Sequence, residues 1–254
     1  MIDHLLNSIS ETELKNDPFD YKFVKNIFPD EFYHDLINNL PEKTEYTPIN
    51  ESGTVNKNYS SERFMFDLNY ENIKKLSIKK QEILSNLLNV FRSRKFFDVI
   101  ANNFKDVISK RISEFTDYEK QLIGTDNFKF TIQAMLVKDL QKYKLGAHTD
   151  TTLKFLTFLF YIPKDLSQIN LGTTLYKPKD DVSIQMGEKG NYHANLKITK
   201  ELFNIVEKIP FSPNSLLLFP RTNYSFHGVE EINTENIERD LIQLNYYFKT
   251  NNNN

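Results

Sequence analysis

Apolar residues follow two different spacings along the chain, and the change falls near residue 125. Before that point they recur every three to four positions, which is the spacing of one face of an α-helix. Three such stripes predict helices, and they consist of Phe32, Leu36 and Leu40; of Leu84, Leu87, Leu88 and Phe91; and of Phe97, Ile100, Phe104, Val107, Ile108 and Ile112. The third stripe is the longest and predicts the longest helix, while Ser77 is a candidate N-cap for the second.

Beyond residue 125 the chain changes to short runs of β-branched and aromatic residues separated by turn residues. These runs predict strands, and they read FKFTIQAMLV, LKFLTFLFYI, GTTLYK, NSLLLFP, NYSFHGV and DLIQLNYYF. Because most of them have no helix between them, they favour an antiparallel sandwich or jelly roll over a parallel sheet. We therefore expect an α+β fold in a single domain over residues 1–254, with helical support in 1–124, a β-core in 125–249 and a disordered tail in 250–254.

The composition is that of an ordinary globular protein, with 39% hydrophobic and 26% charged residues among 254. The formal charge is −2 with both signs mixed, which offers no basic field for nucleic acid or for an anionic membrane. The sequence has neither an apolar run of about 18 residues nor a basic start followed by an apolar stretch. We therefore expect no membrane span, no secretory signal and a cytoplasmic location.

The lack of cysteine limits the chemistry more sharply. Without thiols the chain forms no disulfide, zinc–thiolate site or iron–sulfur cluster, and has no thiol nucleophile. A metal would have to be bound by histidine, carboxylate or backbone groups. Only five histidines are present. Of these, His4 near the N-terminus and His34 on a predicted helix are expected at the surface.

His148 and Asp150 form an H-x-D pair at the start of a predicted strand. Alternation places residues i and i+2 on one strand face, so both side chains could bind one ion. His227, in the run NYSFHGV, could join them, because a jelly roll brings strands distant in sequence side by side. Two imidazoles and one carboxylate leave adjacent metal positions open, as in non-haem iron(II) oxygenases. The alternative for His227 is a half-buried histidine near a strand end.

Arg239 opens the last predicted strand, shortly after His227. A guanidinium buried in so apolar a strand would be costly without a partner. Two arrangements satisfy it: an exposed strand end paired with Glu230 or Glu231, or an anion inside the barrel. A dicarboxylate that chelates the metal would supply that anion, because guanidinium forms bidentate pairs with carboxylate.

In this order the motifs resemble the 2-oxoglutarate- and iron(II)-dependent oxygenases, and the prolyl-4-hydroxylase-like branch in particular. The resemblance covers roughly residues 125–249 and rests on YKLGAHTD, LTFLFYIPKD, LGTTLYKP and SLLLFPRTNYSFHGVEEI, while FVKNIFPDEFYHDLINNLP is similar more loosely. It implies a double-stranded β-helix (jelly-roll, cupin-like) core with supporting N-terminal helices. Two departures bear on the substrate: a longer loop between His227 and Arg239, and Thr173 instead of a second glycine after Gly172.

The resemblance also implies roles for single residues. The Fe(II) ligands would be His148, Asp150 and His227. Arg239 would bind the distal carboxylate of 2-oxoglutarate, with contacts from Tyr161 and help from Thr157 on the same strand face. Tyr143 would either hydrogen-bond near the iron or pack as an ordinary aromatic residue. The implied reaction consumes O₂ and 2-oxoglutarate, releases succinate and CO₂ and hydroxylates a substrate, with desaturation or epimerisation as alternatives.

Two other functions stay open at this point. One is a cupin-like metalloenzyme with the same ligands but without 2-oxoglutarate, from which Arg239 distinguishes the oxygenase. The other is a non-catalytic jelly-roll binding module in which the histidines are incidental. The substrate, a small molecule or a peptide, is not defined. Residues 178–200 interrupt the strands with a polar stretch, which is either a surface excursion or a lid in which His193 would touch substrate.

Overall fold

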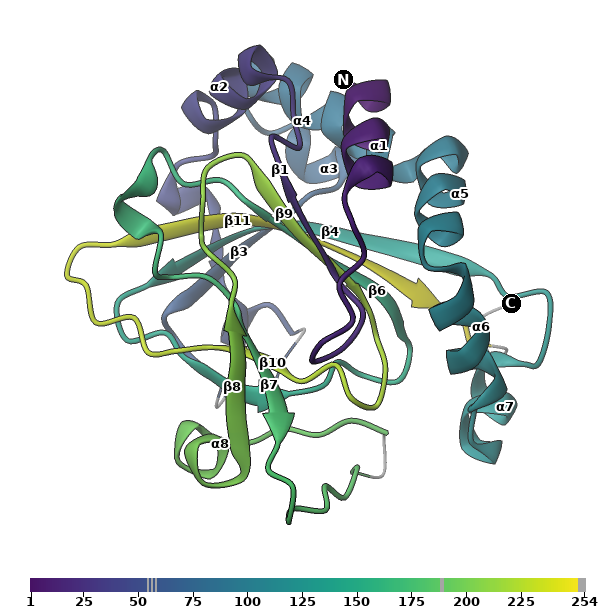
Figure 1. Ribbon diagram of the computed structural model, residues 1–254. Coiled ribbons are helices and arrows are strands. Elements are labelled where there is room, and N and C mark those ends of the chain that lie inside the picture. The colour runs from purple at the N-terminus through teal and green to yellow at the C-terminus, as the bar shows by residue number, and fades with distance from the viewer. Residues whose placement is uncertain (54, 56, 58, 188–189, 251–254) are drawn as a thin grey trace.

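The computed structural model describes residues 1–254 apart from 54, 56, 58, 188–189 and 251–254, so all but the first residue of the tail expected to be disordered lies outside the described residues. Eight antiparallel strands form the core (Figure 1): β4 (Phe130–Leu140), β5 (Leu145–His148), β6 (Lys154–Tyr161), β7 (Thr174–Pro178), β8 (Phe203–Lys208), β9 (Ser215–Pro220), β10 (His227–Val229) and β11 (Glu238–Phe248). They belong to two sheets, ordered β1-β9-β6-β11-β4-β3-β2 and β5-β10-β7-β8, and every connection between successive core strands except β7 to β8 crosses between the sheets. This order is that of a double-stranded β-helix and confirms the expected jelly-roll core.

The N-terminal half adds three strands to the larger sheet, which the helical spacing of its residues did not predict. β1 (Lys22–Lys25) pairs with β9 at one edge. β3 (Arg63–Asp67) pairs with β4 and carries the short β2 (Thr47–Pro48) at the other edge. The expected division into a helical and a β half is wrong at these places, because strands this short show too few alternations to be detected.

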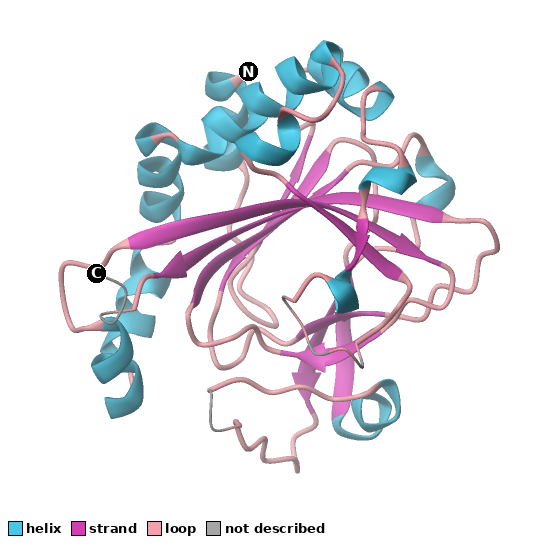
Figure 2. Ribbon diagram, turned by 180° about the vertical axis from the view of Figure 1, so that it is seen from behind, coloured by secondary structure: helices cyan, strands magenta, loops and turns pink. Residues whose placement is uncertain are grey.

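Most helices pack over one face of the larger sheet, as Figure 1 and Figure 2 show from opposite sides. The helices of the described chain are α1 (Ile2–Glu11), α2 (Asp30–Asn38), α3 (Tyr70–Ile73), α4 (Ile78–Arg92), α5 (Arg94–Asn103), α6 (Lys105–Ser113), α7 (Asp117–Ile123) and α8 (Leu196–Leu202), with 3-10 turns η1 (Lys43–Glu45), η2 (Ile49–Glu51) and η3 (Leu166–Gln168). Of these, α8 lies apart from the others and contacts β5 and β8 of the smaller sheet. The contact with the sheet is aromatic: the Phe91 and Phe160 ring centroids lie 5.2 Å apart, and those of Phe96 and Phe158 lie 5.6 Å apart. Within the described part of the chain, no helix combines the length and apolarity that crossing a bilayer requires.

One predicted helix is wrong in its length. The third apolar stripe belongs to two helices, α5 and α6, which meet at Phe104. The Asn103 side chain accepts a hydrogen bond from Lys22 Nζ at 2.6 Å and donates to Val99 O at 2.9 Å, and such local side-chain bonds favour a helix end. Ser77 stands at the N-cap of α4, without a side-chain cap hydrogen bond.

β6 shows why the core strands have continuous apolar runs in their sequence. All eight of its residues are buried, because the helices cover one face and the smaller sheet the other. Phe160 belongs to the core on the helix side, whereas Leu159 belongs to the core between the sheets. Lys154 and Thr157 are therefore buried polar side chains in an apolar strand, and each needs a polar partner.

Candidate metal centre

Three side chains of the type that binds metals converge inside the jelly roll, where β5 and β10 lie side by side. His148 is the last residue of β5 and His227 the first of β10, and the two are direct partners in the antiparallel pair. Their ring centroids lie 4.2 Å apart. The Asp150 carboxylate completes a group whose ligand atoms all lie within 4.8 Å of one another. The structure thus brings together the three residues for which the sequence predicts metal binding.

The position of Asp150 has a different structural cause from the one predicted, which was a strand face shared with His148. β5 ends at His148, so the two members of the H-x-D pair do not share a strand face. Thr149 pairs with Tyr192 instead: its amide donates to the Tyr192 carbonyl at 2.9 Å, and its hydroxyl accepts from the Tyr192 amide at 3.0 Å. Asp150 follows this irregular step, and side chains of β6 decide where its carboxylate lies.

Lys154 and Thr157 hold the Asp150 carboxylate. Lys154 Nζ donates to Oδ1 and Thr157 Oγ1 donates to Oδ2, each at 2.7 Å, and all three residues are buried. Burial alone would raise the pKa of Asp150, but Lys154 and then the two imidazoles hold it well below its usual range. Burial likewise opposes the charge of Lys154, yet Asp150 keeps the lysine pKa above its ordinary value. Asp150 is therefore a fixed anion, as a metal-ligating carboxylate has to be.

Backbone carbonyls orient both histidines. His148 Nδ1 lies 3.1 Å from the Gly146 oxygen, and His227 Nδ1 lies 3.0 Å from the Ser225 oxygen. A carbonyl only accepts, so each Nδ1 carries the proton and each Nε2 keeps a lone pair for a metal. Burial lowers the pKa of both rings, and the neighbouring His227 lowers that of His148 further. Both rings are accordingly neutral at neutral pH, which is the form that ligates.

The three residues border a small cavity of about 50 Å³. Arg63, Arg239, Thr157 and Thr173 also line it, so cationic and hydroxyl groups surround the metal-binding group. Two imidazole nitrogens and one carboxylate oxygen form a mixed donor set that suits Fe(II). Typical ligand pockets measure about 300–1,000 Å³, so a dicarboxylate would enter only if lining side chains move.

Arg239 lies inside the jelly roll and not at an exposed strand end, since it is only 1% exposed. Its Nη1 donates to Asp139 Oδ2 and its Nε donates to the Leu171 carbonyl, both at 2.6 Å. The alternative of a surface pair is wrong: Glu230 pairs with Lys208 and Glu231 with Lys144. The buried partner, Asp139, was not predicted from the sequence.

The tyrosines assigned from the family resemblance differ in their surroundings. Tyr161 is buried, donates its hydroxyl to Thr173 Oγ1 at 2.7 Å and has the Arg239 guanidinium 5.9 Å from its ring centroid. Tyr143 is also buried, but it stacks with Arg63 at 4.2 Å and is not among the described residues that line the cavity. Contacts of Tyr161, Thr157 and Tyr143 with a cosubstrate stay predictions, and the observed partner of Thr157 is Asp150.

Four residues that shape this centre were not singled out in the sequence: Lys154, Arg63, Asp139 and Arg221. Lys154 had a detectable signal, because a lysine within LKFLTFLFYI has to find a buried partner. Arg221 is 1% exposed, donates Nε to the Asp150 carbonyl at 3.2 Å and also bonds the Gly190 carbonyl. Burial lowers its pKa to about 10. Its guanidinium thus links Asp150, a candidate metal ligand, to the polar segment 178–200.

The polar segment 178–200 lies partly against the metal centre, although residues 188–189 fall outside the described part. Its C-terminal end forms most of α8. His193 bridges to the backbone of His148, and the two rings lie 5.5 Å apart, centroid to centroid, with His193 exposed. A lid function, and a contact of His193 with substrate, stay predictions. His4 and His34 are exposed on α1 and α2, as expected.

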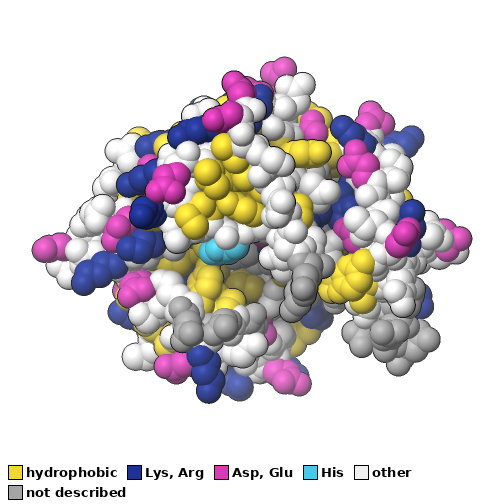
Figure 3. Space-filling view, turned by 90° about the horizontal axis from the view of Figure 1, so that it is seen from below, with side chains coloured by type: hydrophobic (Ala, Val, Ile, Leu, Met, Phe, Trp, Pro, Cys, Tyr) yellow, Lys and Arg dark blue, Asp and Glu magenta, His cyan; other side chains and the backbone are white. Residues whose placement is uncertain are grey.

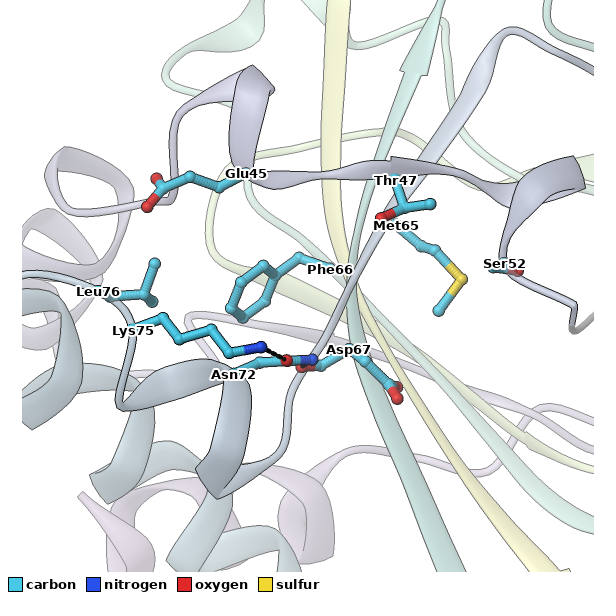
Figure 4. Close-up of a pocket in the computed structure, with 9 residues that line it drawn as sticks. All are labelled: Glu45, Thr47, Ser52, Met65, Phe66, Asp67, Asn72, Lys75 and Leu76. Atoms are coloured by element: carbon cyan, nitrogen blue, oxygen red, sulfur yellow. Dashed lines mark hydrogen bonds between the residues drawn. The ribbon is translucent and has the colours of Figure 1, made fainter.

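Two hollows on the surface differ in the side chains that line them. Figure 3 shows a histidine side chain at the floor of a depression flanked by hydrophobic side chains, on the face seen from below. A separate cavity of about 440 Å³ lies between β3, the two 3-10 turns η1 and η2, and α3, where Glu45, Phe66 and Lys75 line it (Figure 4). Lys75 Nζ donates there to Asn72 Oδ1 at 3.2 Å. Among the described residues that line it, no three histidine or carboxylate side chains lie close enough together to bind one metal ion, so it is not a candidate metal site.

Comparison with known proteins gives structural matches alone, because no family model and no curated protein matches the sequence. The chain is similar to an oxidoreductase of the 2OG-Fe(II) oxygenase family from Burkholderia pseudomallei, with 8% identity and a TM-score of 0.47 over 97% of this chain and 90% of that one. It is similar to a Pseudomonas putida prolyl-4-hydroxylase, with 9% identity and a TM-score of 0.47 over 98% of each. It is also similar to HygX from Streptomyces hygroscopicus, solved with nickel, 2-oxoglutarate and hygromycin B, with 8% identity and a TM-score of 0.46 over 89% of this chain and 82% of that one. Likenesses this low do not support a function, so the fold rests on the strand order and the site on its own geometry.

Proposed function

We propose that the protein is an iron(II)- and 2-oxoglutarate-dependent oxygenase that hydroxylates a substrate. The supporting observation is that one small cavity joins a two-histidine, one-carboxylate group to the buried Arg239. Such a ligand group leaves coordination positions for a chelating cosubstrate and for O₂. A buried guanidinium in the same cavity suits the far carboxylate of a dicarboxylate.

In this proposal the protein holds, orients and shields the reactants. His148, Asp150 and His227 would hold the iron, with the imidazole tautomers fixed by backbone carbonyls. Bound Fe(II) and 2-oxoglutarate would supply the oxidation, in which O₂ is consumed, the cosubstrate loses CO₂ to give succinate, and a substrate C–H bond becomes C–OH. Arg239 would pair with the distal carboxylate, and apolar side chains such as Leu241 would keep water out.

One observation favours a second candidate, a cupin-like metalloenzyme that does not use 2-oxoglutarate. Arg239 already has an ion pair with Asp139 and a hydrogen bond to the Leu171 carbonyl, so it does not need a cosubstrate for a partner. We nevertheless prefer the oxygenase, because the region around Asp139 contains a second arginine, Arg63, and keeps an excess of positive charge.

The direct test is anaerobic titration of 2-oxoglutarate into the iron-loaded protein. We expect a saturable metal-to-ligand charge-transfer absorption band and, with O₂ and a true substrate from a panel, release of succinate. Iron binding without this band at millimolar 2-oxoglutarate would favour the cupin-like enzyme. Protein that does not bind iron at all would favour a non-catalytic jelly-roll module.

A further inference from the structure

Three charged residues form one row across neighbouring strands of the larger sheet. Asp139 of β4 is the direct register partner of Arg63 on β3 and of Arg239 on β11. Direct partners lie on the same face of a sheet, so all three side chains lie together. Asp139 is fully buried, while Arg63 is 8% and Arg239 is 1% exposed.

Asp139 divides its carboxylate between the two arginines. Arg63 donates Nε to Oδ1 at 2.6 Å and Nη2 to Oδ2 at 2.9 Å, a bidentate pair. Arg239 donates Nη1 to Oδ2 at 2.6 Å. The Arg63 guanidinium is also stacked 4.2 Å from the Tyr143 ring centroid, which fixes its plane. The row is therefore rigid, and Asp139 is satisfied by both neighbours.

The row has two cations and one anion, so one positive charge is in excess. Arg63 and Arg239 both line the cavity that the metal-binding group borders. Arg63 Nη1 and Arg239 Nη2 make no hydrogen bond within the described part of the chain. An uncompensated buried charge is unfavourable. A carboxylate bound beside Arg239 would extend the row, so that positive and negative charges would alternate from Arg63 through Asp139 and Arg239 to the ligand.

We infer that Arg63 is a positioning residue for the cosubstrate: it neutralises Asp139 and so leaves Arg239 with the charge that recognises the distal carboxylate. This inference rests on the proposed function. Without Arg63, Asp139 would neutralise Arg239 and would repel an incoming carboxylate a few ångströms away. Asp139 in turn ties Arg239 to the wall of the cavity.

The test is the affinity for 2-oxoglutarate of the anaerobic iron-loaded protein, compared among Arg63→Gln, Asp139→Asn and the double variant. Arg63→Gln should weaken binding by about tenfold or more, since a buried like charge near the ligand is no longer offset. Asp139→Asn should bind at least as tightly as wild type, and the double variant should return to within about threefold of wild type. Arg63→Lys, which keeps the charge, should retain most of the affinity, and Arg94→Gln at the surface should change nothing.

A second ligand separates this role from a general loss of structure. 2-Oxopentanoate has the same chain length and a methyl group in place of the distal carboxylate, so its affinity should be equal in wild type and all these variants. Wild-type affinity for 2-oxoglutarate in Arg63→Gln, or an equal loss for both ligands, would overturn the role of Arg63. If Arg63→Gln alone does not fold, the double variant must still bind 2-oxoglutarate more weakly than Asp139→Asn. Wild-type protein that binds iron but not 2-oxoglutarate would instead overturn the proposed function, and this role with it.

Discussion

Replacing Lys154 by methionine tests the electrostatics of the metal centre most directly. Methionine keeps much of the apolar stem but removes the ammonium that lies 2.7 Å from Asp150 Oδ1, in a pair whose side chains are 8% and 9% exposed. Removing one partner of a buried ion pair typically costs about 3–5 kcal/mol, because the other charge is left uncompensated. The hydrogen bond from Thr157 remains, so we expect the metal-free variant to lose about 3 kcal/mol of unfolding free energy.

Metal affinity should change in the opposite direction and rise in Lys154→Met. A metal about 2 Å from a carboxylate oxygen would lie roughly 4–5 Å from the Lys154 ammonium. At an effective dielectric constant of about 20, a dication and an ammonium at that distance repel by about 7 kcal/mol before any relaxation. If even one fifth of that repulsion survives relaxation, Lys154→Met should bind metal about tenfold more tightly than wild type. The metal would also replace the lost countercharge of Asp150.

Urea unfolding with and without metal measures both stabilities, and competition with a chelator measures the metal affinity. Lys144→Met is the matched control, because Lys144 pairs with Glu231 at 3.1 Å with side chains 50% and 37% exposed. Exposed pairs contribute little, so this control should change stability by less than about 1 kcal/mol and leave metal affinity unchanged. Weaker metal binding in Lys154→Met, or a stability equal to that of the control, would refute the reasoning.

Three further predictions concern the residues that would hold metal and cosubstrate. Arg239→Gln should weaken 2-oxoglutarate binding by about 30-fold while iron affinity stays unchanged, and Arg239→Lys should restore binding only in part; unchanged titration of the charge-transfer band would place the cosubstrate elsewhere. His148→Ala, Asp150→Ala and His227→Ala should each abolish iron-dependent turnover and keep a native circular dichroism spectrum, and wild-type iron content in His148→Ala/Asp150→Ala would mean that the metal binds at another site. Because both histidine pKa values are lowered in the folded chain, the unfolded chain takes up protons first, so metal-free stability should fall as pH drops through about 6.5. This slope should be shallower in His148→Ala/His227→Ala but not in the exposed His34→Ala, and a flat urea-stability profile between about pH 7.5 and 5.5 would contradict it.

The amino-acid sequence by itself determined six of the eight core strands and the candidate ligands, whereas β5 and β8 were not predicted. Strands such as β6 are covered on both faces, so their burial appears directly as an apolar run in the local composition. The supply of metal-binding side chains was equally restrictive, because the chain has five histidines and no cysteine. The apolar strand that Arg239 opens left two arrangements for its side chain: a surface pair at an exposed strand end, or an anion inside the barrel.

Tertiary structure decided how these groups are partnered. Asp139 lies 76 residues from Arg63 and 100 residues from Arg239 along the chain, and only the strand register brings the three together. Asp150 lies beyond the end of β5, where Thr149 bonds to the distant Tyr192, a contact without a local sequence signal. The strands β1, β2 and β3 likewise exist only through their pairing with the core sheet. Local patterns record which residues are buried, whereas hydrogen bonds and ion pairs between distant segments depend on a register that no single segment encodes.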